Sequence, residues 1–173
     1  MIGPRHVLAG LVCLMLTHEA SAQVRLIEAG IVCPRETSGE LVPAPNTESG
    51  VIRQIDRETS FDLNAREVPT IDLLSFGFRT TLKDGVGPQE VAIVVTHPPM
   101  GERAVTRQEW VDVLAPGETN LNLFTFEEEY EKVPGPWAFS VEVDGEAVVT
   151  VPFMVVADGG RSAVEATCFQ FMS

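Results

Sequence analysis

The chain has 173 residues, 45% of them hydrophobic and 21% charged, so it can bury a core but is too short for two ordinary domains. With 12 Lys and Arg against 25 Asp and Glu, its net charge is −13. Nucleic-acid binding depends on clustered cations that displace counterions from phosphates, so this composition argues against a nucleic-acid partner.

The first 22 residues have the three-part layout of a secretory signal peptide. Arg5 and His6 precede an apolar run over residues 7–16, and small residues stand before a cleavage point between Ala22 and Gln23. The run is far shorter than the roughly 20 residues of a membrane span, and no second long run follows. We therefore expect a periplasmic or secreted protein whose mature chain does not insert into a membrane.

Removal of residues 1–22 would leave two of the three cysteines, Cys33 and Cys168, one near each end of the mature chain. In an oxidising compartment two thiols are most simply interpreted as one structural disulfide, because a redox pair is more often closely spaced. The alternatives are two free buried thiols, or a catalytic cysteine served by His97. We expect the bridge to hold a C-terminal tail, residues 157–173, on a single domain formed by residues 23–156.

The N-terminal part of that domain predicts two strands with a long connection between them. Residues 26–32 and 73–82 are the strand candidates, and Gly77 in the second marks a bulge or a point of close packing. The segment 34–59 is rich in proline and glycine and predicts a connection with at most one edge strand. In the second strand one parity carries large or β-branched side chains: Leu74, Phe76, Phe78 and Thr80.

The middle of the chain predicts further strands. Residues 91–96 form a continuous apolar, β-branched run bounded by prolines, which is typical of a central strand. Residues 121–126 are a weaker strand candidate. The segment 107–114 is ambiguous, because Trp110, Val113 and Leu114 would also fit a short helix. We leave strand and helix open for this part of the chain, residues 105–114.

A hairpin is the clearest element. Trp137, Phe139, Val141 and Val143 alternate with smaller or polar residues, as in a half-buried strand, and Asp144-Gly145 then supplies a tight turn. The return strand is predicted over residues 147–156, where Pro152 indicates an edge or a bulge. Seven or so short strands without βαβ alternation predict an all-β fold, an antiparallel immunoglobulin-like β-sandwich, with a barrel of the same strands as the alternative.

The segment His97, Pro98, Pro99, Met100 and Gly101 is the candidate binding loop, placed at a strand end and stiffened by two prolines. His97 and Met100 would also suit half of a copper site, but a copper carrier needs more ligands than the chain offers. His97 lacks a serine nucleophile in a Gly-x-Ser-x-Gly turn. We predict no catalytic residues, no metal site and no cofactor.

An acidic run, Glu127, Glu128, Glu129 and Glu131, surrounds Tyr130. On a strand these carboxylates would point to opposite faces, so they would not converge on a calcium ion, and we interpret the run as a solvated face. Tyr130 is predicted to be a core or corner residue. The other aromatic residues alternate with polar ones and are interpreted as core, with Trp110 the best candidate for a surface platform that stacks on sugars.

Several segments resemble a bacterial family of small exported proteins whose domain is of unknown function. They are Glu-x-Gly-Ile-x-Cys at 28–33, Val-Thr-His-Pro-Pro-Met-Gly at 95–101, Thr-Arg-Gln-x-Trp at 106–110, Phe126, and Tyr-Glu-x-Val-Pro-Gly-Pro-Trp-x-Phe at 130–139. The resemblance covers about residues 26–156. It implies a β-sandwich exported by Gram-negative bacteria and carries no activity, ligand or catalytic residue with it.

These observations predict a non-catalytic binding or interaction module of the bacterial envelope, whose partner is an envelope protein or a glycan. Loops at one end of the sandwich would present the contact surface. An envelope hydrolase that acts on polysaccharide or peptide is the alternative, and it would need a cleft with convergent carboxylates. A metal-handling protein that uses His97 and Met100 is the third hypothesis.

Overall fold

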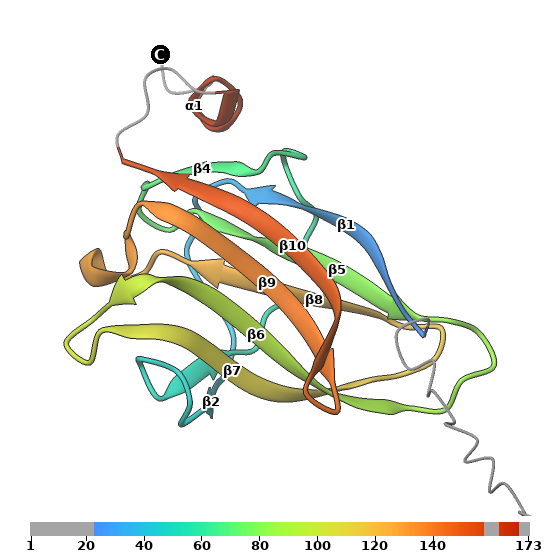
Figure 1. Ribbon diagram of the computed structural model, residues 1–173. Helices are drawn as coiled ribbons and strands as arrows, with labels where there is room; N and C mark the ends of the chain where they lie inside the picture. Colours follow the sequence, from blue (N-terminus) through green and yellow to red (C-terminus); the bar gives the residue numbers. More distant parts are fainter. Residues whose placement is uncertain (1–22, 158–162, 170–173) are drawn as a thin grey trace, which may run out of the picture.

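Two β-sheets packed face to face form the body of the protein in the computed structural model, which describes residues 23–157 and 163–169 (Figure 1). One sheet has the strand order β1-β5-β8 and the other β4-β10-β9-β6-β7, while β2 and β3 form a separate hairpin. All strands pair antiparallel except β4, which runs parallel to β10. The predicted antiparallel immunoglobulin-like β-sandwich is confirmed. The elements are β1 (Val24–Val32), β2 (Leu41–Pro43), β3 (Val51–Arg53), β4 (Glu67–Pro69), β5 (Ser75–Leu82), β6 (Gln89–Met100), β7 (Val105–Leu114), β8 (Thr119–Thr125), η2 (Glu129–Glu131), β9 (Gly135–Val143), β10 (Glu146–Val156) and α1 (Ala163–Cys168).

The core lies between the two sheets and is centred on Phe76 of β5. Its ring contacts aromatic rings on both sheets, with centroids 6.0 Å from Phe124 of β8 and 5.5 Å from Trp137 of β9. The alternation predicted for β9 is confirmed, because every second residue from Trp137 to Val143 is buried. The period-two pattern therefore places the large side chains of both sheets in one shared interior.

The hairpin β9–β10 turns at Asp144 and Gly145, whose φ angles of 52° and 80° match the predicted tight turn. Pro152 pairs with Ala138 of β9, and on the other side of β10 the strand β4 reaches only Met154–Val156. Pro152 thus lies where one side of β10 is unpaired, the edge position that its missing N–H requires.

The ambiguous segment 105–114 is the strand β7. It pairs with β6 from Gln89↔Leu114 to Thr96↔Arg107 and forms one edge of the five-stranded sheet. The spacing of Trp110, Val113 and Leu114 also fits a helix, because both faces of this edge strand carry apolar as well as polar residues and a strict alternation is absent.

The connection between β1 and β5 differs from the prediction. It contains two short strands, β2 and β3, rather than at most one, and a third, β4, close to β5. Residues 44–50, called loop 44–50 below, join β2 to β3. Further on, the backbone pairs with β1, where Ile31 donates to the carbonyl of Leu63 at 2.9 Å and accepts from Asp62 at 2.9 Å. This second part, residues 54–66, is called segment 54–66.

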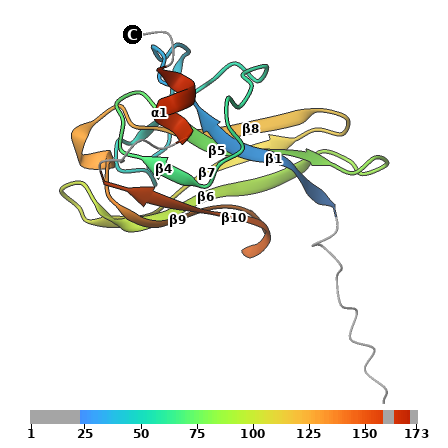
Figure 2. The same cartoon turned by 90° about the horizontal axis from the view of Figure 1, so that it is seen from above.

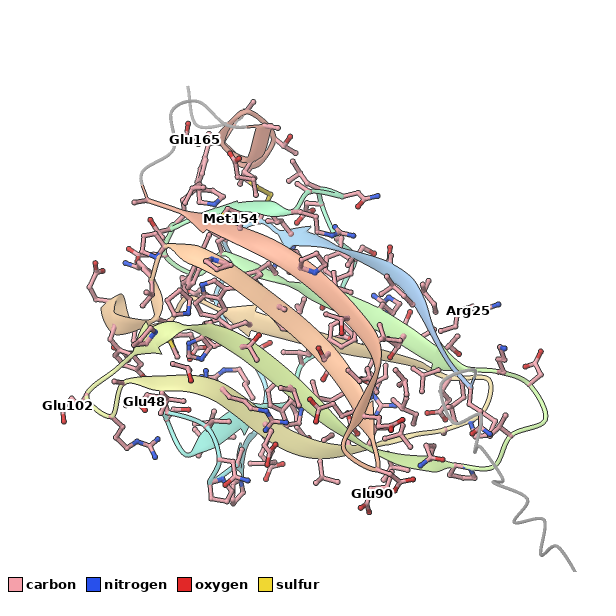
Figure 3. All side chains as sticks on the ribbon, viewed as in Figure 1. Arg25, Glu48, Glu90, Glu102, Met154 and Glu165 are labelled. Carbon is pink, nitrogen blue, oxygen red and sulfur yellow. A yellow bond between two sulfur atoms is a disulfide. The ribbon has the colours of Figure 1, made fainter. Side chains whose placement is uncertain are left out.

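The C-terminal tail is attached by a disulfide between Cys33 and Cys168, whose Cα atoms are 5.4 Å apart (yellow bond in Figure 3). The described part of the tail is the short helix α1, and its Val164 is buried. Figure 1 shows α1 beyond β4, outside the two sheets, and Figure 2 shows the same helix from above. The predicted signal peptide, residues 1–22, lies outside the described residues. Among the described residues, no helix is long and apolar enough to cross a membrane.

Candidate functional site

The candidate binding segment 97–101 is not the exposed loop that the sequence predicted. Residues 97–100 are the irregular end of β6, with a register shift between Thr96 and Met100, and the turn to β7 begins at Gly101. His97 and Met100 are only 6% and 2% exposed. The prediction failed because two consecutive prolines normally end a strand, whereas here the bulge lets Met100 pair again with Val105.

Two segments quoted for the family resemblance pack against each other at this end of the sandwich. The ring of His97 lies 4.6 Å from that of Trp137 at an interplanar angle of 33°. Gly135 has a φ of 135°, and a Cβ there would lie 2.8 Å from Cγ of Pro98. The Trp137 indole N–H donates to the carbonyl of Val133 at 2.9 Å. The His-Pro-Pro-Met-Gly and Val-Pro-Gly-Pro-Trp segments are therefore one packing unit.

A chain of side-chain contacts links His97 to loop 44–50. The Nδ1 atom of His97 lies 2.8 Å from the carbonyl oxygen of Pro98, and Nε2 lies 3.0 Å from Nε2 of Gln108 on β7. Oε1 of Gln108 accepts from the backbone N–H of Glu48 at 2.8 Å. Burial lowers the pKa of His97, although the Pro98 carbonyl and the charge of Glu48 oppose this shift.

The turn after β6 holds the same loop from its other side. Gly101 has a φ of 70°, which favours glycine, and a Cβ there would displace the end of the Glu48 side chain, 2.3 Å away. The Arg103 guanidinium donates to the Glu48 carboxylate at 3.1 Å and to the carbonyls of Thr47 and Glu48 at 2.7 and 2.8 Å. Figure 3 places Glu48 and Glu102 at this end and Glu90 far from it.

Loop 44–50 and the β6–β7 hairpin border a cleft of about 360 Å³ that is open to solvent. One wall is residues 45–47, and the other is made by Arg103, Val105, Arg107 and Glu109. The loop also touches the free edge of β7, where the Glu109 N–H donates to the carbonyl of Asn46 at 3.3 Å. A second depression, near Val113, has no room for a water-sized group. The cleft at the hairpin is thus the larger of these two hollows.

Arg107 extends from the cleft across the outer face of the five-stranded sheet. It pairs with Glu109 and, at 2.9 Å, with Glu142 of β9, so its side chain crosses β6. Val94 of β6 lies between these groups in the register and is buried although it faces outward. The arginine therefore shields an outward valine, and its hydrogen bond with Glu109 raises its own pKa.

The acidic run lies at the same end and is partly structural. Glu127 pairs with Arg53 of β3 at 3.1 Å, and this hydrogen bond lowers the Glu127 pKa. The carboxylate of Glu131 accepts from the backbone N–H groups of Glu127 and Glu128 at 2.7 and 2.8 Å, which caps η2. Burial nevertheless raises the pKa of Glu131 to about 7. The interpretation as a solvated face is therefore incomplete.

Two further residues that the sequence singled out have different outcomes: Tyr130 is more exposed than a core residue, whereas Trp110 agrees with the interpretation of the aromatic residues as core. Tyr130 is 38% exposed and so is not a core residue, and the partial burial that it has raises its pKa. Trp110 is half-buried and packs against the core, so it does not form an exposed platform for stacking on sugars. Lys132 pairs with Asp72 and Glu129 and ties η2 to the chain before β5.

The described part of the chain does not bring together the ligands of a metal centre, and the side chains that the sequence singled out for nucleophilic chemistry are engaged elsewhere. Within residues 23–157 and 163–169, no group of three or more His, Cys, Asp or Glu side chains is placed to hold a metal ion. Both ring nitrogens of His97 are engaged by Pro98 and Gln108, and Cys33 and Cys168 are joined to each other. The available chemistry is that of a surface with hydrogen-bond donors, acceptors and two guanidinium groups.

Sequence reasoning missed loop 44–50 and both of its anchors. The loop looked like irregular connection, and Gln108 and Arg103 carried no pattern of their own. One signal was available: Gln108 stands in the Thr-Arg-Gln-x-Trp segment quoted for the resemblance, beside the histidine segment in the hairpin register. The β6–β7 pairing of Val95 with Gln108 would have placed the amide next to the imidazole.

The two packed sheets and the cleft at one end define the chain as an immunoglobulin-like β-sandwich. The chain belongs to a family described as a domain of unknown function (DUF3859), whose model matches residues 20–155. This match confirms the resemblance to a family whose domain is of unknown function. A search of curated proteins found no match.

Among solved structures, the chain is similar to the crystal structure of an immunoglobulin-like protein from Pseudomonas aeruginosa. The identity is 21%, the TM-score is 0.46, and the similarity covers 79% of this chain and 99% of that one.

Proposed function

We propose that this domain is a non-catalytic binding module of the bacterial envelope, which contacts an envelope protein or glycan through the cleft between loop 44–50 and the β6–β7 hairpin. The single observation that carries the proposal is the cleft itself, about 360 Å³ in volume and lined by both polar and apolar groups. Loops at one end of a rigid sandwich are a common place for contact surfaces.

The composition of the cleft supports recognition rather than turnover. Arg103 and Arg107 present guanidinium groups, and Asn46 and Glu109 present an amide and a carboxylate, while Val105 adds an apolar patch. Such a mixture resembles the polar rim and small apolar centre of protein interfaces. A hydrolase of glycosides would need two carboxylates in the cleft, and Glu109 is the single carboxylate among the residues that line it.

Photo-crosslinking from a single position tests the proposal. A benzoylphenylalanine at Pro45, which is exposed on the cleft wall, should give a crosslinked species of discrete mass in cells that express the full chain. The matched control carries the same group at Thr150, exposed on the outer face of β10. Equal crosslinking from both positions, or none from Pro45, would contradict the proposal.

Replacement of both cleft arginines sharpens this test. Arg103→Gln with Arg107→Gln should remove the species crosslinked from Pro45 while the fold, followed by circular dichroism, is kept. Arg25→Gln with Arg35→Gln is the control, because these two arginines lie outside the cleft. If the control pair removes the species as well, net charge and not the cleft decides the contact.

A further inference from the structure

We propose that protonation of His97 releases loop 44–50 from the β6–β7 hairpin and so remodels the cleft. The inference rests on the proposed function only in giving that cleft a use, since the release is a property of the domain itself. The basis of the release is the hydrogen-bond chain from His97 through Gln108 to Glu48. The Pro98 carbonyl, which can only accept, fixes one end of this chain, and the Glu48 N–H, which can only donate, fixes the other.

A carbonyl oxygen can only accept, so the 2.8 Å contact with Pro98 requires a proton on Nδ1 of His97. In the neutral ring Nε2 then accepts, and Nε2 of Gln108 donates to it at 3.0 Å. That orientation turns Oε1 of Gln108 toward the Glu48 N–H, which donates at 2.8 Å. The docked loop and the neutral Nδ1–H ring are therefore one consistent arrangement.

A second proton on His97 breaks this arrangement. Nε2 becomes a donor and faces the NH₂ group of Gln108. Rotation of the amide would offer Oε1 to the ring, but it would then turn NH₂ toward the Glu48 N–H. Either way two donors oppose each other, and His97 and Gln108 are 6% and 5% exposed, so water does not reach them freely. The contact to the loop is the one that can give way, because His97 and Gln108 lie on β6 and β7, which are held together by backbone pairing.

Every element packed on His97 contributes to the balance. From loop 44–50 the Glu48 carboxylate favours the charged ring, and Arg103 on the turn neutralises that carboxylate. From β9 the stacked Trp137 ring is uncharged, and β7 contributes the amide of Gln108. Burial opposes the charged form and outweighs Glu48, because the net shift of the His97 pKa is downward.

The direction of the effect follows from that shift. The ordinary pKa of histidine is about 6.5. A histidine whose pKa is lower than this in the folded protein makes a contribution to stability that is fully present above pH of about 6.5. The contribution is lost as the pH falls from 6.5 through the lowered pKa. We therefore expect the loop to be docked at neutral pH and released in mildly acidic solution.

Nuclear magnetic resonance tests this directly, because His97 is the only histidine after residue 22. In a titration from pH 8 to pH 4, the His97 ring and the Glu48 amide should change with one midpoint, below 6.5. Protection of the Glu48 amide against hydrogen exchange should fall by about tenfold or more. A Glu48 amide that is indifferent to the His97 titration would overturn the proposal.

Gln108→Glu provides the decisive variant. A carboxylate accepts from both the charged ring and the Glu48 N–H, so His97 should titrate above 6.5 and the loop should stay docked at pH 5. Gln89→Glu makes the same chemical change at the far end of β6 and should leave the titration as in the wild type. Release of the loop in Gln108→Glu at the wild-type pH would refute the proposed role of the amide.

The two proposals fail separately. Crosslinking from Pro45 at pH 7.5 depends on the cleft and not on the titration. If Pro45 gives no crosslink but the Glu48 amide titrates together with His97, the proposed binding function is wrong and the proposed loop release stands. If Pro45 gives a crosslink but the Glu48 amide does not change when His97 titrates, the proposed loop release is wrong and the proposed binding function stands.

Discussion

The connection between β1 and β5 docks on the sandwich twice, and the two contacts are built differently. Segment 54–66 is held by Arg79 of β5, whose side chain is 11% exposed and donates to the carbonyls of Arg57 and Thr59 at 2.6 Å each. Loop 44–50 is held by Arg103, whose side chain is 56% exposed, and by the buried relay through Gln108. Segment 54–66 is therefore a permanent cover of the sandwich, whereas loop 44–50 is a docked loop that protonation of His97 releases.

The covalent anchor lies on the side of the permanent cover. The Cys33 N–H donates to the Asp62 carboxylate at 2.7 Å, and Cys33 itself is bonded to Cys168. Segment 54–66 is thus joined to β1 by backbone pairing, by this side chain and by its position beside the disulfide. Loop 44–50 has no comparable backbone ladder within the described residues, only the single bond from Glu109 to Asn46.

The largest expected effect comes from loss of the disulfide. Its cysteines are 135 residues apart, and closing a loop of that length stabilises a fold by about 5 kcal/mol on the chain-entropy model. The variant Cys33→Ser with Cys168→Ser should lose an amount of that order in urea unfolding. Wild type that has been reduced and alkylated is the control. A loss below about 1 kcal/mol would show that the cover does not need the bond.

The two arginines come next. Arg79→Met should lower the free energy of unfolding by about 3 kcal/mol, because it removes the donor from two part-buried carbonyls and from the Glu28 carboxylate. Arg103→Met should cost only about 0.5 kcal/mol, because the Arg103 side chain is 56% exposed and water can replace it at Glu48 and at the two carbonyls. Urea unfolding measures both values. Equal losses would remove the distinction between the two contacts.

Two glycines probe the same distinction with a single methyl group. A Cβ at Gly30 would lie 2.1 Å from the carbonyl oxygen of Leu63, so Gly30→Ala should destabilise the whole fold by about 2 kcal/mol. Gly101→Ala should cost about 1 kcal/mol and expose loop 44–50 to exchange. Gly85→Ala is its control, because Gly85 also has a positive φ of 82° but nothing within 4 Å. Loop exposure in Gly85→Ala would contradict the assigned contact.

The smallest effect concerns pH at the acidic corner. Because the Glu131 pKa is raised to about 7 from 4.5, its favourable contribution is complete below pH 4.5 and is lost as the pH rises through 7. Relative to Glu131→Gln, wild type should lose stability between pH 5 and pH 8, as followed by thermal unfolding. Glu129→Gln is the control at an exposed neighbour. A difference that is flat with pH would mean that the Glu131 carboxylate is already ionised at pH 5.

Much of the fold was predictable because its signals are local. The alternation from Trp137 to Val143 and the Asp144-Gly145 turn specify a hairpin without reference to the rest of the chain. Gly77 was predicted as a bulge or a close contact, and it is the latter: β5 pairs with β8 without a register shift there. A Cβ at this position would lie 2.0 Å from the Asn122 carbonyl oxygen.

The candidate site was less predictable, since it depends on contacts far apart in the sequence. The histidine segment was singled out, yet its role is set by Gln108 and Glu48, which local patterns do not mark. Strands of three residues, such as β2, β3 and β4, are too short to show a period. Helix α1 escaped notice because its six residues are too few to show a helical period.

Native-state hydrogen exchange at pH 7.5 tests the contrast between the two contacts most directly. The Glu48 amide should exchange through a local opening whose free energy lies well below that of global unfolding and is insensitive to low urea. The amides of Ile31 and Leu63, which join β1 to segment 54–66, should exchange only with global unfolding. If the Glu48 amide opens with the same free energy as these two, loop 44–50 is part of the permanent cover and the account is wrong.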